Sequence, residues 1–173
     1  MDARGVADRG AEIGVIIRRA APADRPALAA ALASDGTFRD DEVAVALELV
    51  DASLAGSVDY ELLVAELDGE AAGYVCFGPT PMTRATFDLY WVVVHAAARG
   101  RGIAVALVRA MEDALAGRGG GQVRVETSET EGYGAARRLY EKLGYPEQAR
   151  FDDFYAPGDA LLVYYKRVSA APP

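Results

Sequence analysis

A short apolar run, a glycine-rich loop and an amphipathic segment follow one another near the middle of the chain. The run from Leu89 to Val94 is rich in aromatic and β-branched residues, which is typical of a buried strand. The loop after it has the sequence Arg-Gly-Arg-Gly-Ile-Ala at residues 99–104. Apolar residues then recur on one helical face, at Ala104, Leu107, Val108, Met111 and Leu115. This order turns free backbone N–H groups and a helix N-terminus toward one point, which attracts phosphate.

Three kinds of phosphate-binding loop resemble this hexad in composition, and two of them do not match its residues. A Walker A loop needs Lys and Ser or Thr after its last glycine, and neither follows Gly102. A dinucleotide fingerprint needs a third glycine where Val105 stands. The third pattern is Arg/Gln-x-x-Gly-x-Gly/Ala, which Arg99, Gly102 and Ala104 satisfy. It resembles motif A of the GNAT superfamily of N-acetyltransferases, whose loop holds the pyrophosphate of acetyl-coenzyme A. A glycine turn that serves only helix packing is the alternative.

Charge and cysteine content argue against several other classes of function. The chain of 173 residues has 18 basic and 26 acidic residues, a formal charge of −8, which argues against nucleic acid as a partner. Cys76 is the only cysteine, so neither an internal disulfide nor a cysteine-rich metal site is expected. No apolar run approaches the roughly 18 to 20 residues that span a bilayer, and no signal peptide is visible. We expect a cytoplasmic protein with no metal and no membrane partner.

Periodicity and turn signals predict the order of the elements. The expected order is one strand, two helices, three strands, a helix, a strand, a helix and two strands. The strands are expected at residues 15–19, 60–67, 71–77, 89–94, 123–127, 147–155 and 161–166. We predict a single domain over residues 15–168, after a flexible lead-in at residues 1–14 and before a disordered tail at residues 169–173.

A second motif strengthens the resemblance. The run Ala136-x-x-Leu139-Tyr140-x-x-x-Gly144-Tyr145 resembles motif B of the GNAT superfamily, and Tyr133 stands where that family usually has asparagine. The resemblance implies an α/β (α+β) fold with a mixed, mostly antiparallel central sheet. It further implies about six or seven strands, about four flanking helices and a splayed central strand pair.

The resemblance also implies acetyl-coenzyme A as cosubstrate. In the family, pantetheine pairs with the exposed edge of the central strand, and the loop binds the pyrophosphate. Carried over to this chain, the expected cofactor-binding residues are Val92, Val93, Val94, Arg99, Gly100, Arg101, Gly102, Ile103, Ala104, Tyr133 and Ala136.

The family's usual mechanism is direct attack of an amine on the thioester, without a covalent enzyme intermediate. An alkyl amine with a pKa near about 10.4 is protonated at neutral pH, so a base must take its proton. Asp88 and Glu126 are the candidates, and either could instead be a structural or surface carboxylate. Tyr140 occupies the family's general-acid position, with a core aromatic residue as the alternative.

The acceptor is expected to contact Phe38, Tyr90, Phe154 and Tyr155. The segments that contain these residues mix aromatic and acidic side chains, and such a mixture suits a small cationic amine. The leading hypothesis is therefore acetyl transfer to the primary amine of a small molecule, either an amine or an amino-acid-like acceptor. There are two alternatives: acetylation of a protein N-terminus or lysine, and a non-catalytic sensor that binds acyl-coenzyme A. A homodimer is possible.

Overall fold

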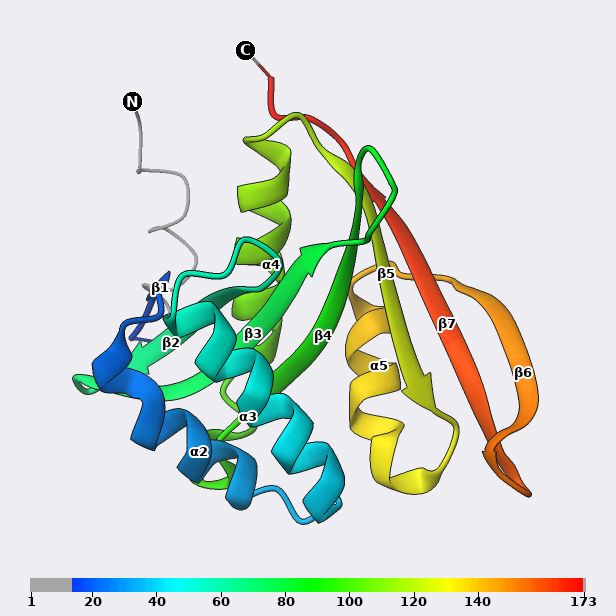
Figure 1. Ribbon diagram of the computed structural model, residues 1–173, viewed down its shortest axis with the longest axis horizontal. Helices are drawn as coiled ribbons and strands as arrows, with labels where there is room; N and C mark the ends of the chain where they lie inside the picture. The colour runs from blue at the N-terminus through cyan, green and yellow to red at the C-terminus, as the bar shows by residue number, and fades with distance from the viewer. Residues whose placement is uncertain (1–13, 173) are drawn as a thin grey trace.

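The centre of the structure is a seven-stranded sheet of order β1-β2-β3-β4-β5-β7-β6 (Figure 1). The structure is a computed structural model that describes residues 14–172. The strands are β1 (Val15–Arg19), β2 (Glu61–Leu67), β3 (Glu70–Pro79), β4 (Thr86–Val94), β5 (Gly121–Ser128), β6 (Glu147–Ala156) and β7 (Asp159–Val168). Neighbouring strands run antiparallel except β4 and β5, which are parallel.

Helices cover both faces of the sheet (Figure 1). Helices α2 (Arg25–Ala33) and α3 (Asp40–Leu54) lie on one face, and α4 (Ile103–Ala116) and α5 (Gly134–Lys142) on the other. Strand β3 alternates between the two cores. Tyr74 and Cys76 pack under α2 and α3, whereas Val75 and Phe77 pack against α4. Strands that are apolar on both faces therefore read as continuous apolar runs in the sequence.

The predicted order of elements and the predicted mixed sheet are confirmed. The β2–β3 hairpin turns at Asp68 and Gly69, whose φ angles of 53° and 86° are both left-handed, as a two-residue hairpin turn of this type requires. The predicted lead-in lies outside the described residues except for Gly14. Disorder of the tail stays a prediction, although the Ala171 N–H donates to the carbonyl oxygen of Ala116 (2.9 Å).

Strands β4 and β5 separate after a short paired stretch. They pair only from Thr86 with Gln122 to Leu89 with Val125. On the other side of β4, Cys76 faces Trp91 and Phe77 faces Leu89, so Tyr90 is an extra residue that forms a bulge. A bulge bends its strand and increases the local twist. The rest of β4 therefore diverges from β5, which confirms the predicted splayed pair.

Gly78 of β3 lies where the chain is closely packed beside β4 and β5. A Cβ atom added there would lie 1.8 Å from the carbonyl oxygen of Asp59. We expect Gly78→Ala to lower the free energy of unfolding by about 1–3 kcal/mol, because backbone must shift to admit the methyl group. Urea denaturation followed by circular dichroism measures the change. Gly36→Ala is the control, since a Cβ at Gly36 meets no atom within 4 Å; equal losses in both variants would contradict the packing argument.

Candidate active site

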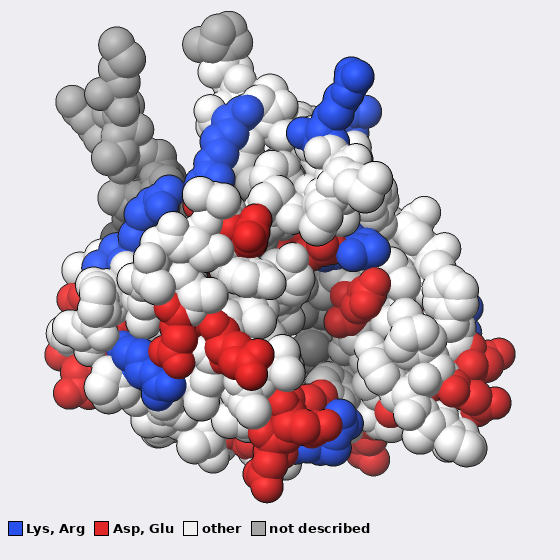
Figure 2. Space-filling view, in the orientation of Figure 1, with Lys and Arg blue, Asp and Glu red and all other residues white. Residues whose placement is uncertain are grey.

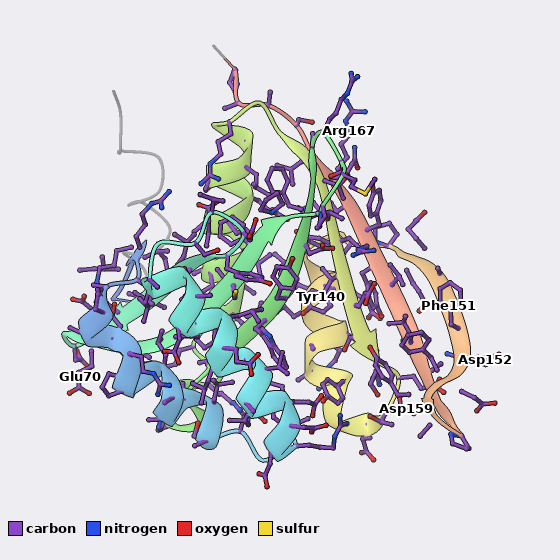
Figure 3. All side chains as sticks on the ribbon, viewed as in Figure 1. Glu70, Tyr140, Phe151, Asp152, Asp159 and Arg167 are labelled. Atoms are coloured by element: carbon purple, nitrogen blue, oxygen red, sulfur yellow. The ribbon has the colours of Figure 1, made fainter. Side chains whose placement is uncertain are left out.

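The gap between β4 and β5 is bordered by two cavities. One, of about 400 Å³, lies beside the glycine-rich loop and α5, and we call it the loop cavity. The other, of about 460 Å³, lies beside α3 and several aromatic side chains, and we call it the aromatic cavity. Residues lining both are Phe38, Val92, Tyr133, Ala136 and Tyr140. The two cavities therefore meet at the gap, where Figure 3 labels Tyr140 on α5.

The loop presents free backbone donors to the loop cavity. Gly100 and Gly102 have φ angles of 77° and 78°, and Gly102 is the N-cap of α4. A Cβ at either position would meet no atom within 4 Å, so backbone conformation rather than space requires glycine in the protein alone. The first N–H that bonds back to the start of the helix is that of Ala106, which donates to the Gly102 carbonyl (3.0 Å). The N–H groups of residues 103–105 precede it and have no partner within the helix.

Most of the expected cofactor-binding residues line the loop cavity. They are Val92, Val94, Arg99, Gly100, Gly102, Ile103, Ala104, Tyr133 and Ala136. Val93 and Arg101 do not line it: the Val93 side chain is buried in the core under α2, and Arg101 is exposed. Alternation along β4 explains Val93, because successive side chains of a strand point to opposite faces.

Arg99 is engaged within the protein. Its Nη2 donates to Asp35 Oδ2 (2.6 Å), and its Nε donates to the Val94 carbonyl (3.2 Å). Asp35 belongs to the α2–α3 connection and lines the same cavity, so this ion pair ties the loop to that connection. Further positive charge at the cavity comes from Arg138 and Lys142 of α5.

Tyr140 lies at the junction of the two cavities. Its side chain is buried, at 5% exposure, and its ring packs against the rings of Tyr145 (6.1 Å between centroids) and Tyr164 (5.6 Å). Burial, and to a lesser extent Tyr164, raises the pKa of Tyr140 above its ordinary value. Among residues 14–172, no side chain or backbone group forms a hydrogen bond with the Tyr140 hydroxyl. The Tyr133 hydroxyl, in contrast, donates to Glu42. The phenol of Tyr140 is thus a neutral donor at the gap.

The two carboxylates expected near the reaction centre differ in their bonding. Asp88 is buried, and its oxygens accept hydrogen bonds from Arg124 Nε (2.7 Å) and Thr80 Oγ1 (2.8 Å). Glu126 is half-exposed, with Arg124 Nη1 at 3.6 Å from its Oε1, too far for a hydrogen bond. Both residues line the aromatic cavity, but Glu126 has the less engaged carboxylate.

Three of the four expected acceptor residues line the aromatic cavity: Phe38, Tyr90 and Tyr155. Phe154 does not. Its side chain is exposed, and its ring packs edge-on against that of Tyr155 with 5.0 Å between centroids. Burial, followed by the charge of Asp88, raises the pKa of Tyr90 to about 12.

Sequence reasoning missed other residues of this cavity. Tyr60 and Trp91 complete its aromatic wall, with centroids 5.5 Å from Tyr90 and 5.3 Å from Phe38 respectively. Glu42 and Asp159 add carboxylates from α3 and from the start of β7. The aromatic residues in and beside the strands were a usable signal, whereas the two carboxylates come from segments far apart in sequence.

Tyr133 connects the two sides of the site. Its hydroxyl donates to Glu42 Oε1 (2.5 Å), while Glu42 Oε2 accepts the Arg39 N–H (2.9 Å) at the start of α3. Burial and the bonded carboxylate of Glu42 raise the pKa of Tyr133. Its expected role in cofactor binding stays a prediction, but its present partner is on α3.

Residues 14–172 lack two kinds of structural feature. No helix among them is long and apolar enough to cross a membrane. They also contain no group of three or more His, Cys, Asp or Glu side chains placed to hold a metal ion. Cys76 is buried, and burial raises the pKa of its thiol to about 12.

The split sheet brings a glycine-rich loop at a helix N-terminus and a second cavity to one buried tyrosine. The family model for the acetyltransferase (GNAT) family matches residues 29–145. The chain belongs to this family and is an acyltransferase.

One solved structure supports the same assignment, and two more distant ones share the fold. A protein from Desulfovibrio desulfuricans, assigned to the GNAT acetyltransferases, is 35% identical, with a TM-score of 0.83 over 90% of this chain and 99% of that one. The ribosomal-protein-S18-alanine N-acetyltransferase of Escherichia coli is 18% identical (TM-score 0.74; 91% and 96% covered). An aminoglycoside 6′-N-acetyltransferase complexed with coenzyme A is 19% identical (TM-score 0.71; 91% and 99% covered). No curated protein matches the sequence significantly.

The bonding of Asp88 predicts a structural contribution. We expect Asp88→Ala to lower the free energy of unfolding by about 1–3 kcal/mol, because Arg124 and Thr80 both lose their acceptor. Glu126→Ala should change it by less than about 0.5 kcal/mol, since Glu126 is half-exposed and not hydrogen-bonded to Arg124. Urea denaturation of both variants measures this, and a larger loss for Glu126→Ala would refute the assignment.

Proposed function

We propose that this acyltransferase moves an acetyl group from acetyl-coenzyme A to the primary amine of a small molecule. The observation that carries the proposal is the position of Tyr140, a buried phenol that lines both cavities. One cavity has the backbone donors that suit an anionic donor substrate, and the other has the aromatic and acidic wall that suits an amine. Substrates held in the two cavities meet beside Tyr140.

The residues of the loop cavity fit acetyl-coenzyme A. The N–H groups of residues 103–105 and the N-terminus of α4 would bind the pyrophosphate. Beyond Leu89, β4 has no strand paired to its β5 side, so the backbone of Val92 to Val94 is available to pantetheine as a missing strand would be. Arg138 and Lys142 add positive charge at the same cavity.

The chemical step balances without a covalent intermediate. The amine nitrogen attacks the thioester carbonyl, an N–C bond forms, and the C–S bond breaks. Glu126 takes one proton from the ammonium group through water, because its carboxylate is less engaged than that of Asp88. Tyr140 donates a hydrogen bond to the departing sulfur, and the second proton of the nitrogen, lost after the attack, passes through water to this thiolate. A thiol titrates near about 8.5, below the raised pKa of Tyr140, so the phenol stays protonated throughout the step.

Donor binding can be tested at the loop. We expect the wild type to bind acetyl-coenzyme A with roughly micromolar affinity in calorimetry. We expect Gly102→Glu to show no binding, because a carboxylate would then face the pyrophosphate. Gly144→Glu is the matched control: Gly144 has the same left-handed φ of 77° but lines neither cavity. Loss of binding in both variants, or in neither, would count against the loop as the binding site.

Tyr140 can be tested separately from binding. We expect Tyr140→Phe to lower kcat by about 10²-fold while leaving the affinity for coenzyme A within about twofold. The raised pKa also predicts that the protonated phenol is lost only above about pH 10, so Tyr140 causes no decline in wild-type activity below that pH. Tyr145→Phe is the control, a neighbouring buried tyrosine that lines neither cavity. Thiol release over a pH series measures these effects; unchanged kcat in Tyr140→Phe would remove its assigned role.

A further inference from the structure

We propose that the acceptor is a small diamine, whose reacting amine lies at the gap while its second, cationic nitrogen is held by Asp159. This inference rests on the proposed function and names the substrate class of the same site. It depends on the charges, positions and aromatic surroundings of the residues that line the aromatic cavity.

Negative charge exceeds positive charge in the aromatic cavity. Four carboxylates and two guanidinium groups line it, and they are Glu42, Asp88, Glu126 and Asp159 against Arg39 and Arg124. Both arginines already have partners: Arg124 donates to Asp88 (2.7 Å), and Arg39 donates to Asp41 (3.1 Å) and forms an ion pair with Glu42 (3.8 Å). The guanidinium groups of Arg39 and Arg124, which line the cavity, are therefore already paired and do not offer a site for a carboxylate of the acceptor. A free amino acid would place its carboxylate against this excess of negative charge.

Three of these carboxylates line the cavity together with Tyr155. After burial, the negative charges of Glu126, Asp159 and Glu42 are what raise the pKa of Tyr155. Asp159 accepts one hydrogen bond from Ser128 Oγ (2.5 Å), which orients it. It lies at the start of β7 in Figure 3, and Figure 2 shows acidic side chains around the hollow between α3 and β5. These carboxylates come from α3, β5 and β7, so the fold converges them on one place.

Aromatic side chains form another part of the cavity lining. Tyr60 and Tyr90 meet edge to face with 5.5 Å between ring centroids, and Phe38 and Trp91 do so at 5.3 Å. Such rings contact methylene groups through their apolar surface and attract ammonium groups through their faces. A short alkyl chain with an ammonium group at each end is complementary to these rings and to the carboxylates that share the cavity.

Three acceptors of equal chain length test the proposal: 1,5-diaminopentane, pentylamine and 5-aminopentanoate. Each has a primary amine on a five-carbon chain, and the other end carries an ammonium group, a methyl group or a carboxylate respectively. Transfer from acetyl-coenzyme A is followed by thiol release, corrected for the reaction without enzyme. We expect kcat/KM for the diamine to exceed that for pentylamine by about tenfold or more, as a charge-assisted contact provides. We expect 5-aminopentanoate to be the poorest acceptor.

One variant and its control locate the second nitrogen. Asp159→Asn keeps an acceptor for Ser128 but removes the charge, and we expect it to reduce the diamine-to-pentylamine ratio by at least about threefold. Asp152→Asn, on exposed β6 and outside the cavity, should keep the wild-type ratio. Figure 3 labels both residues.

The outcomes separate this inference from the proposed function. Equal kcat/KM for the diamine and pentylamine, or a preference for 5-aminopentanoate, overturns the diamine while leaving small-amine acetylation in place. An unaltered ratio in Asp159→Asn overturns the binding position. Acetylation of peptide amines with no transfer to any of the three small acceptors overturns both the diamine and the small-molecule proposal, even where coenzyme A binds.

Discussion

Strands β4 and β5 pair over only four residues, and the site depends on that separation. Each strand is fully held on its other side, β4 by β3 and β5 by β7, whose pairing extends from Gly121 to Ser128. Neither strand can therefore rotate to close the gap without breaking a ladder that it already has. The backbone groups facing the gap need partners from water or from a ligand, because unpaired buried N–H and C=O groups are costly. A sheet with this defect is suited to binding an extended molecule.

Polar contacts hold the borders of the gap in place. The ion pair of Asp88 with Arg124 links β4 to β5 at the last part of their paired stretch. The Tyr133 hydroxyl bonded to Glu42 links the start of α5 to α3 across the junction of the cavities. Each contact joins elements that lie on different sides of the gap. The gap is thus open in the sheet but braced by side chains, which limits how far substrates can vary in their approach.

Local sequence signals predicted the parts of the site that are themselves local. Gly100 and Gly102 supply the left-handed backbone just before α4, and Tyr140 was indicated by the resemblance of its motif to that of a known family. The order of elements followed in the same way from periodicity and from turns such as Asp68-Gly69.

The features that depend on register were not visible in the sequence. Pairing of Asp88 with Arg124 requires that β4 and β5 align those two residues, which no single segment specifies. The bulge at Tyr90 exists only relative to β3, and it decides which β4 side chains line the cavities. Phe154 illustrates the same limit, since it and Tyr155 are adjacent in sequence but only Tyr155 lines the aromatic cavity.

The two cavities present opposite charge to their substrates. Backbone donors, the N-terminus of α4, Arg138 and Lys142 favour an anion in the loop cavity, within a chain whose formal charge is −8. Carboxylates in excess favour a cation in the aromatic cavity. Because the cavities meet only at the gap, the phosphates of a donor in the wrong cavity would face carboxylates, and a cationic acceptor in the wrong cavity would face positive charge. Charge separation of this kind selects the pairing that brings the thioester and the amine to Tyr140.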